Sequence, residues 1–340
     1  MSRLFRNDYS ELCHELVLEE YRKALCEQND PYGLDKYSKS ASGLIRKEFN
    51  CEEAEVHFLV GGTQANMTVI SYLLRDYEAV LAVNSGHINV HETGAVEGSG
   101  HKVYTVEGID GKVTASEIKE ALRINSNEHC VKIKMVYISD STEIGTIYTL
   151  KELEEISKVC KENDMYLFLD GARLGVALTS CMNDVKASDI SKYCDVFYIG
   201  GTKNGLMFGE AVVITNKALQ KEFRWQIKNK GAMLAKGFAC SIGFDCLFRN
   251  GLYFEIAKNS NKQAEYLKKE LIRLGFDVSP SYTNQLFVTM EKEKAKDLIN
   301  RYGCEEWCEV GDKMTIRFVT SFSTKKEDVK ELVEYLEKNK

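Results

Sequence analysis

Proline is almost missing from this chain of 340 residues, which has it only at Pro31 and Pro280. No proline-rich linker therefore marks a division between parts of the chain. Long apolar runs are missing as well, since stretches such as residues 135–138 and 166–169 fall far short of the roughly 20 residues that span a bilayer. Residues 1–15 lack the apolar centre of a signal peptide. We therefore expect a cytoplasmic protein with no membrane partner.

Paired cysteines and blocks of like charge are also absent. The 11 cysteines are scattered singly between Cys13 and Cys308 without a Cys-x-x-Cys pair, which excludes a zinc ribbon or a dithiol redox motif. We expect them to be reduced and mostly buried. The net charge is −6, and no long run of one sign stands out, so the composition argues against a nucleic-acid partner.

Two common nucleotide-binding signatures are missing. The chain has no Gly-x-Gly-x-x-Gly, which argues against a nicotinamide dinucleotide, and no Gly-x-x-x-x-Gly-Lys-Ser/Thr around its glycine turns. The chemistry must therefore come from other residues.

Short β-branched or aromatic runs do alternate with helix-like segments. We expect strands at residues 79–83, 102–106, 134–138, 165–169, 195–199 and 211–215, and helices at 64–75, 115–122 and 150–162. This alternation predicts an α/β fold with a mainly parallel, doubly wound sheet. Beyond about residue 254 the pattern becomes α+β, with a helix at 259–274, strands at 284–290 and 314–319, and a last helix from Lys325 with Thr324 as its N-cap.

We predict three parts from this pattern. Residues 1–30 form an N-terminal segment, residues 31–250 a large domain and residues 251–340 a small α+β domain.

Polar residues follow several of the predicted strands. His87, Glu143, Asp170 and Lys203 each come shortly after a strand end, with Arg173 close behind Asp170. Ligands bind beyond the carboxyl ends of the strands in open α/β sheets, so together these residues predict a site. Each residue alone has a simpler interpretation. Asp170 would be a helix cap, His87 a partly buried histidine and Lys203 a solvated loop residue.

A glycine turn precedes the first long helix. The stretch Gly61-Gly62-Thr63 leads from a short strand into the helix, where free N–H groups and the helix dipole favour phosphate. The alternative is a simple turn with an N-cap. A phosphate site, an acid, a histidine and an isolated lysine match pyridoxal phosphate, whose aldehyde a lysine holds covalently and whose ring nitrogen faces a carboxylate.

Four motifs extend this interpretation. The stretches 62–66 (GTQAN), 86–95 (GHINVHETGA), 169–173 (LDGAR) and 202–205 (TKNG) resemble, in order and approximate spacing, the threonine aldolase/β-eliminating lyase family. Arg317 within IRFVT extends the similarity. The resemblance implies pyridoxal phosphate as cofactor, the aspartate-aminotransferase-like fold type I with a sheet of the seven-stranded type, and a homodimer or homotetramer with shared active sites. It also implies that residues 1–30 contribute to the active site and the dimer and that residues 31–250 bind the cofactor.

The resemblance also implies a role for each residue. Lys203 would bind the cofactor aldehyde, Asp170 would face the pyridine nitrogen and His87 would stack on the ring. Gly62, Thr63 and Thr202 would help to hold the cofactor. Arg173, Arg317 and Asn7 would bind the substrate carboxylate.

Two positions depart from the family pattern. Glu143 stands where threonine aldolases usually have a histidine that contacts the substrate hydroxyl, so Glu143, His87 or water must accept that proton. Leu234 stands where an arginine commonly reaches the phosphate of the partner subunit. Lys228, Lys230 or Lys236 would have to replace that charge, without the bidentate geometry of arginine.

The first functional hypothesis is a pyridoxal-phosphate-dependent carbon–carbon lyase that cleaves a β-hydroxy-α-amino acid, L-threonine or L-allo-threonine, to glycine and acetaldehyde. The second keeps the cofactor but expects β-elimination, racemisation or transamination of another amino acid, because the loop histidine is missing. A third is a catalytically idle fold used for binding.

Overall fold

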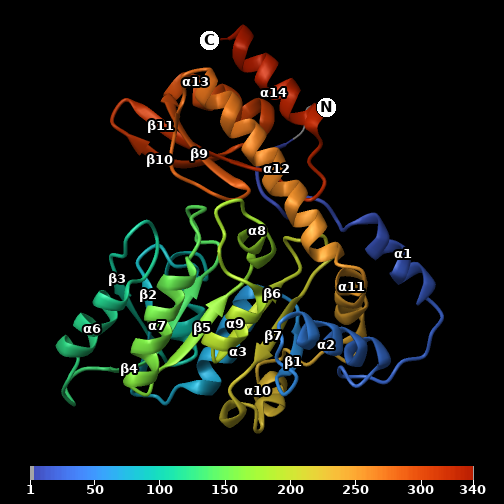
Figure 1. The fold of residues 1–340 in the computed structure, drawn as a ribbon, viewed down its shortest axis with the longest axis vertical. Coiled ribbons are helices and arrows are strands. Elements are labelled where there is room, and N and C mark those ends of the chain that lie inside the picture. Colours follow the sequence, from blue (N-terminus) through green and yellow to red (C-terminus); the bar gives the residue numbers. More distant parts are fainter. Residues whose placement is uncertain (1–3, 340) are drawn as a thin grey trace.

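The computed structural model describes residues 4–339, and its centre is a seven-stranded sheet in the order β1-β7-β6-β5-β4-β2-β3 (Figure 1). The strands are β1 (Glu55–Leu59), β2 (Glu78–Val83), β3 (Lys102–Val106), β4 (Lys132–Ser139), β5 (Tyr166–Asp170), β6 (Val196–Gly200) and β7 (Glu210–Ile214). Neighbours pair in parallel except at β7, which is antiparallel to both β1 and β6. The predicted mainly parallel α/β sheet is confirmed, and each predicted strand lies within two residues of the observed one.

Helices cover both faces of this sheet because its strands are buried on both sides. One core joins the sheet to α2 (Lys36–Glu48), α6 (Ala115–Ile124), α7 (Leu150–Glu162), α9 (Ala187–Tyr193) and α11 (Phe238–Arg249). The other joins it to α3 (Gly62–Leu73), α5 (Ala95–Gly98) and α10 (Phe223–Asn229). Along β2, Leu81 and Val83 belong to the first core whereas Val80 and Ala82 belong to the second, as strand alternation requires. The sheet is therefore doubly wound.

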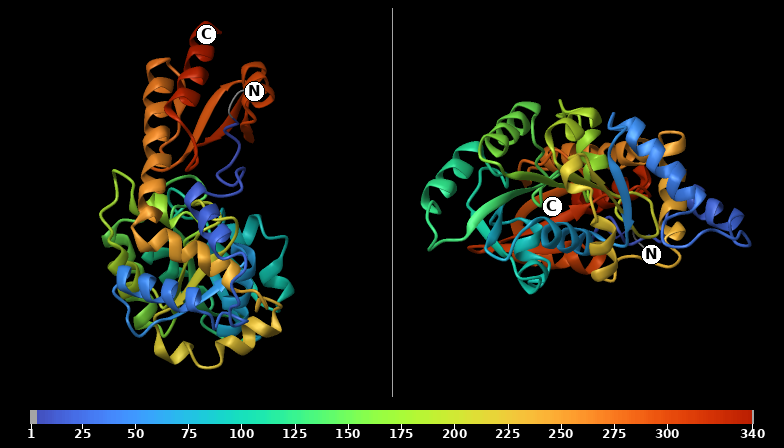
Figure 2. Two further views of the ribbon diagram at one scale, coloured as in Figure 1. Left: turned by 90° about the vertical axis from the view of Figure 1, so that its right-hand side faces the viewer. Right: turned by 90° about the horizontal axis from the view of Figure 1, so that it is seen from below.

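A second, antiparallel sheet stands on one end of this body (Figures 1 and 2). Its strand order is β10-β11-β9-β8, with β8 (Asp277–Val278), β9 (Gln285–Glu291), β10 (Glu305–Val310) and β11 (Lys313–Val319). Its core includes side chains of α12 (Leu252–Arg273), α13 (Lys292–Tyr302) and α14 (Lys326–Lys338). Strand β10 was not predicted from the sequence, because five of its six residues are exposed and it is rich in glutamate.

Helix α12 connects the two bodies. Its first turns place Tyr253 and Ile256 in the core of the large sheet, whereas Leu267 and Leu271 lie in the core of the small one. The prediction of Thr324 as the N-cap of the last helix was wrong. Lys325 occupies the N-cap position of α14, and its N–H donates to Asp328 at 2.8 Å. The Thr324 hydroxyl instead accepts the Ser321 N–H at 2.8 Å.

The N-terminal segment runs along both bodies before α1 (Glu15–Lys23). Phe5 bonds through its backbone to Tyr302 and Val319 of the small domain, each at 2.8 Å, and His14 N–H donates to Gly205 at 2.8 Å. The remaining short helices are α4 (His87–Val90), α8 (Leu174–Leu178) and the 3₁₀ turn Lys217–Leu219. The limits 1–30, 31–250 and 251–340 stay a prediction. Across residues 4–339, none of the helices is both long and apolar enough to cross a membrane.

Candidate active site

A cavity of about 310 Å³ lies at the carboxyl ends of β4, β5 and β6. Because parallel strands end at the same edge of a sheet, it collects side chains that are far apart in the sequence. The cavity is lined by Tyr9, Val60, Gly61, Gly62, Thr63, His87, Ser139, Ser141, Glu143, Asp170, Ala172, Arg173, Tyr198, Thr202, Lys203 and Glu210. Of the predicted site residues, only Asn7 and Arg317 do not line it.

Asp170 ends strand β5 as a buried, fully hydrogen-bonded carboxylate. It accepts hydrogen bonds from the hydroxyls of Tyr137 and Tyr198, from Asn66 Nδ2 at 3.2 Å and from the Ala172 N–H at 2.9 Å. Burial alone would raise the pKa of Asp170, but the charge of His87 and the two tyrosine hydroxyls outweigh it, so the pKa is lowered. Asp170 therefore carries a negative charge at neutral pH, which suits a positively charged ring nitrogen.

Lys203 lies in the tight connection between β6 and β7. Its ammonium nitrogen is 5.9 Å from the centroid of the Tyr9 ring. Burial, and then the positive charge of Arg173, lower the pKa of Lys203. An amine with a lowered pKa is a better nucleophile at neutral pH.

The glycines around Lys203 are required by close backbone contacts. A Cβ at Gly200 would lie 2.2 Å from the Ala172 carbonyl oxygen, and one at Gly201 would lie 2.7 Å from that of Gly209. The glycines therefore let strand ends and loop pack together.

Helix α3 points its N-terminus into the cavity through Gly61, Gly62 and Thr63. Its N-cap, Gly61, has no side chain to occupy the first N–H groups, so these face the cavity as an anion site. A Cβ at Gly62 would lie 2.9 Å from the Tyr198 hydroxyl. A side chain at position 62 would therefore displace the Tyr198 hydroxyl.

His87 is held by a carboxylate that the sequence analysis did not assign to the site. Its Nδ1 lies 2.8 Å from Glu92 Oε1, and the same oxygen accepts from Asn66 Nδ2 at 2.7 Å. Asn66 also donates to Asp170, so one hydrogen-bond network connects His87 to Asp170. This contact sets which ring nitrogen of His87 stays available for proton transfer.

Glu143 lines the cavity, and its carboxyl group is buried. Its Oε1 accepts from the backbone N–H of His87 at 3.0 Å and from the Ser139 hydroxyl at 2.8 Å. Among the described residues, Oε2 has no hydrogen-bond partner. Burial and the nearby Asp170 charge raise the pKa of Glu143.

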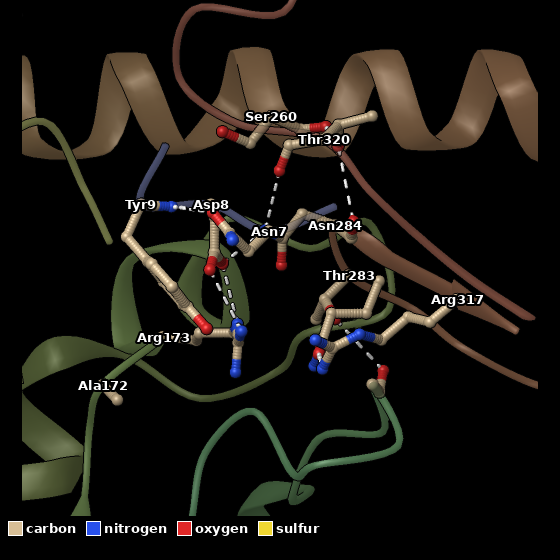
Figure 3. A network of polar contacts seen from close by, with 12 residues as sticks. Asn7, Asp8, Tyr9, Ala172, Arg173, Ser260, Thr283, Asn284, Arg317 and Thr320 are labelled. Atoms are coloured by element: carbon tan, nitrogen blue, oxygen red, sulfur yellow. Dashed lines mark hydrogen bonds and ion pairs between the residues drawn. The ribbon is translucent and has the colours of Figure 1, made fainter. Parts of the chain in front are cut away.

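The two predicted carboxylate-binding arginines are both engaged within the protein (Figure 3). Asp8 binds Arg173 in a bidentate pair, at 2.8 Å to Nε and 3.0 Å to Nη2, and accepts from Asn284 at 2.8 Å. Arg317 donates to Gln285 at 3.0 Å and to Glu305. Both pairings orient the guanidinium groups, and of the two arginines Arg173 lines the cavity.

Asn7 has a local role in this structure. Its side-chain oxygen accepts from the Tyr9 N–H at 3.1 Å and from the Ser10 hydroxyl at 2.8 Å. This turn orients the neighbours of Asn7, so that Asp8 meets Arg173 and Tyr9 faces the cavity (Figure 3).

Leu234 lies away from this cavity. It lines a small cavity of about 40 Å³ with Met233, His57 and Arg224. Lys228 lies 5.0 Å from the centroid of the Tyr32 ring, in an open apolar hollow that Trp225 also lines.

Sequence reasoning missed five residues that shape the site: Asp8, Glu92, Tyr137, Tyr198 and Glu210. Glu92 lies inside one of the matched motifs. It stands two residues before Gly94, where the backbone turns with a positive φ. Tyr137 and Tyr198 lie on β4 and β6 and reach Asp170 on the strand between them. Only the strand order reveals that convergence.

Comparisons with known proteins agree with this site. The family model of β-eliminating lyases matches residues 16–293. The chain belongs to the β-eliminating lyase family. A low-specificity L-threonine aldolase of Pseudomonas sp. (strain NCIMB 10558) shares 30% identity with this chain, over 97% of this chain and 96% of its own.

Solved structures show the same relationship. The Leishmania major threonine aldolase is 42% identical, with a TM-score of 0.97 over 99% of both chains. An aspartate aminotransferase of Thermus thermophilus, 14% identical, has a TM-score of 0.72 over 98% of this chain and 94% of its own, and this similarity concerns the fold. The predicted family, fold type I and pyridoxal-phosphate dependence are confirmed for this chain.

The residues present fit pyridoxal phosphate. A helix N-terminus whose N-cap glycine has no side chain suits the phosphate, the ionised Asp170 suits the pyridine nitrogen, and the lowered pKa of Lys203 suits a covalent bond to the aldehyde.

Proposed function

We propose that the protein is a pyridoxal-phosphate-dependent carbon–carbon lyase that cleaves L-threonine or L-allo-threonine to glycine and acetaldehyde. The main support is that one cavity is lined by Lys203, Asp170, His87 and Glu143 together. The similar proteins named L-threonine aldolase support the substrate class. When bound, the cofactor supplies an electron sink for the pair that the broken Cα–Cβ bond leaves at Cα.

The residues of this chain would then act as follows. Lys203 binds the cofactor aldehyde, and Asp170 keeps the ring nitrogen protonated. Gly62 and Thr63, at the N-terminus of α3, would hold the phosphate, and Thr202, in the loop before Lys203, would help to hold the cofactor; all three line the cavity. His87, fixed through Nδ1 by Glu92, stacks on the ring and moves protons through Nε2. Arg173, Arg317 and the segment around Asn7 bind the substrate carboxylate.

Glu143 would be the base that accepts the proton of the β-hydroxyl. Its Oε2 is a buried oxygen with no hydrogen-bond partner among residues 4–339, so its capacity to accept a proton is unused within the protein. The raised pKa of Glu143 makes its carboxylate a stronger base once ionised, at the cost of a smaller ionised fraction at low pH.

We further propose a homodimer or homotetramer in the cytoplasm. An exposed apolar surface supports this, because Trp225 is 79% exposed and lies beside Tyr32 and Met233. In such an assembly Lys228, Lys230 or Lys236 would replace the charge that Leu234 lacks. The domain limits 1–30, 31–250 and 251–340 belong to the same proposal.

The test is to incubate the purified protein with pyridoxal phosphate and L-threonine, and to couple acetaldehyde to an alcohol dehydrogenase and NADH. We expect glycine and acetaldehyde in equal amounts, and neither from Lys203→Ala. Pyruvate and ammonia from L-serine, without acetaldehyde from either threonine isomer, would refute the aldolase in favour of β-elimination.

A further inference from the structure

Glu210 is a buried acid of the cavity that no step of the proposed function uses. It is the first residue of β7, paired with Leu59 of β1 and Gly200 of β6, and is only 4% exposed. It therefore lies between the strand that leads to the helix N-terminus and the strand that leads to Lys203. A buried carboxyl group is costly unless its oxygens are satisfied.

Both oxygens of Glu210 hold the residues directly before Lys203. Oε2 accepts the backbone N–H of Gly201 at 3.0 Å, and Oε1 accepts the hydroxyl of Thr202 at 2.9 Å. The Thr202 oxygen in turn accepts the N–H of Gly209 at 3.0 Å. The Gly209 carbonyl receives the N–H groups of Gly201 and Thr202 at 3.0 and 3.1 Å. Residues 201–209, here named the lysine loop, are thus closed on themselves and anchored to Glu210.

We propose that Glu210 is the positioning residue of the lysine loop, whose two carboxyl oxygens hold Gly201 and Thr202 so that the Lys203 side chain stays in the cavity. The inference rests on the proposed function only in taking Lys203 as the lysine that binds the cofactor. Its geometric part concerns the cofactor-free protein and is testable there.

The charge state of Glu210 adds a second expectation. Burial raises the pKa of Glu210 to about 8, against the opposing effects of Thr202, Gly201 and Lys203. The other titratable groups that interact with Glu210 are Asp170 on β5, Tyr198 on β6, Cys240 on α11 and Tyr253 on α12. Burial therefore favours the uncharged form of Glu210 at neutral pH, and the share of the anion, whose charge raises the pKa of Lys203, grows as the pH rises through about 8.

Glutamine separates the two effects. Its amide matches the uncharged carboxyl group, because the carbonyl can accept from Gly201 and the NH₂ can donate to the Thr202 oxygen. Glu210→Gln should therefore keep the loop in place at every pH but lose the charge effect above pH 8, whereas Glu210→Ala should lose both.

The experiment measures the reactivity of Lys203 in the cofactor-free protein. Competitive labelling with acetic anhydride is read by peptide mass spectrometry, with the exposed Lys151 as internal reference, and hydrogen exchange follows residues 201–209. The control is Glu78→Ala, because Glu78 is also a buried first residue of a strand, 4% exposed, which accepts the Arg75 N–H at 3.0 Å. Glu78 begins β2, which runs antiparallel to β7. Glu78 therefore lies at the end of the sheet that is opposite to the cavity.

We expect Glu210→Ala to speed hydrogen exchange in the lysine loop and labelling of Lys203 by roughly tenfold or more at pH 7, since two hydrogen bonds that close the loop are lost. Glu210→Gln should match the wild type at pH 7 and label faster at pH 9. The control should change neither readout.

Unchanged labelling and exchange in Glu210→Ala, or equal changes in the Glu78→Ala control, would overturn the positioning role. A glutamine variant that behaves like alanine at pH 7 would also overturn it. None of these outcomes depends on aldolase activity, so failure of this inference and failure of the proposed reaction are told apart.

Discussion

Asp170 and Glu143 are both buried carboxyl groups at the same edge of the sheet, yet their surroundings shift their pKa values in opposite directions. Four donors and the charge of His87 stabilise the anion of Asp170, whereas Glu143 has donors on one oxygen only and the Asp170 charge nearby. Environments that separate the pKa values of two acids are a common way to assign them different tasks. Each assignment leads to a prediction for a single side chain.

Tyr137→Phe should weaken the support of Asp170. Loss of a hydrogen bond to a charged, buried group costs about 1.5–3 kcal/mol, so we expect a loss of that size in the urea unfolding free energy of the cofactor-free protein at pH 7. The lowered pKa of Asp170 gives stability that is present above its unfolded value and is lost as the pH falls through the folded value. The loss in the variant should therefore shrink under acid.

Tyr335→Phe is the control for that experiment, because Tyr335 donates to Asp297 at 2.5 Å on an exposed surface. We expect Tyr335→Phe to change the unfolding free energy much less than Tyr137→Phe, because water competes for an exposed contact. Equal losses in both variants would contradict a special role for the Tyr137 contact.

Glu143→Gln should reduce kcat/KM for L-threonine by roughly 10²- to 10⁴-fold, the usual contribution of a general base. In the wild type, kcat/KM should rise with pH through the raised pKa of Glu143, because only the ionised form accepts the proton. The variant should lose this rise of kcat/KM with pH.

Ser139→Ala removes a hydrogen bond that lowers the pKa of Glu143, so it should move the rise of kcat/KM to higher pH. A Glu143→Gln variant that retains the rise would exclude Glu143 as the base.

Between elements, the decisive contacts are those where strand ends meet without room for side chains. A Cβ on Gly171, just after β5, would lie 2.0 Å from the carbonyl oxygen of Tyr198 on β6. The close approach of β5 and β6 is what brings Asp170 and Lys203 to one cavity.

Gly171→Ala should destabilise the protein by about 1–3 kcal/mol or more, because backbone must move to admit the methyl group. Gly43→Ala in helix α2 is the matched control, since a Cβ there meets nothing within 4 Å. We expect Gly43→Ala to raise the free energy of unfolding by about 0.5–1 kcal/mol. The two unfolding curves should therefore move in opposite directions, and a neutral Gly171→Ala would contradict the close packing of β5 against β6.

At the scale of the whole molecule, Asp8 joins three parts of the chain. Asp8 lies on the N-terminal segment. It binds Arg173, which follows strand β5 of the large sheet, and Asn284, which precedes β9 of the small sheet. Burial acts to raise the pKa of Asp8, but the charges of Arg173 and Lys203 and the hydrogen bonds from Arg173 and Asn284 together outweigh it, so the pKa of Asp8 lies below its usual value.

Asp8→Asn should cost about 3–5 kcal/mol of unfolding free energy at pH 7, because it leaves the buried Arg173 without its counter-charge. The stability contributed by Asp8 is present above its unfolded pKa and is lost as the pH falls through the lower folded value, so the difference should narrow in acid. Glu19→Gln, which breaks an exposed pair with Arg22, should lower the unfolding free energy far less, because water screens that pair. Similar costs for both would show that the Asp8 contact does not connect the parts.

Local patterns in the sequence were enough for the strand–helix alternation, the doubly wound sheet and the residues that follow each strand end. Hydrophobic periodicity and turn residues act over a few neighbours, so they are legible without a structure. Thus Lys203, Asp170, His87 and Glu143 could be proposed together. Strand β10 could not be predicted, because its exposed glutamates lack the alternation of a half-buried strand.

Only the tertiary structure decided which side chains each of those residues meets. Tyr137, Tyr198 and Asn66 converge on Asp170, and Glu210 reaches the residues before Lys203, because of the strand order and the reversed direction of β7. The sequence by itself determined the chemistry available to this protein. Pairing between distant strands determined the burial and charge around each group, and hence the pKa shifts on which its proposed roles depend.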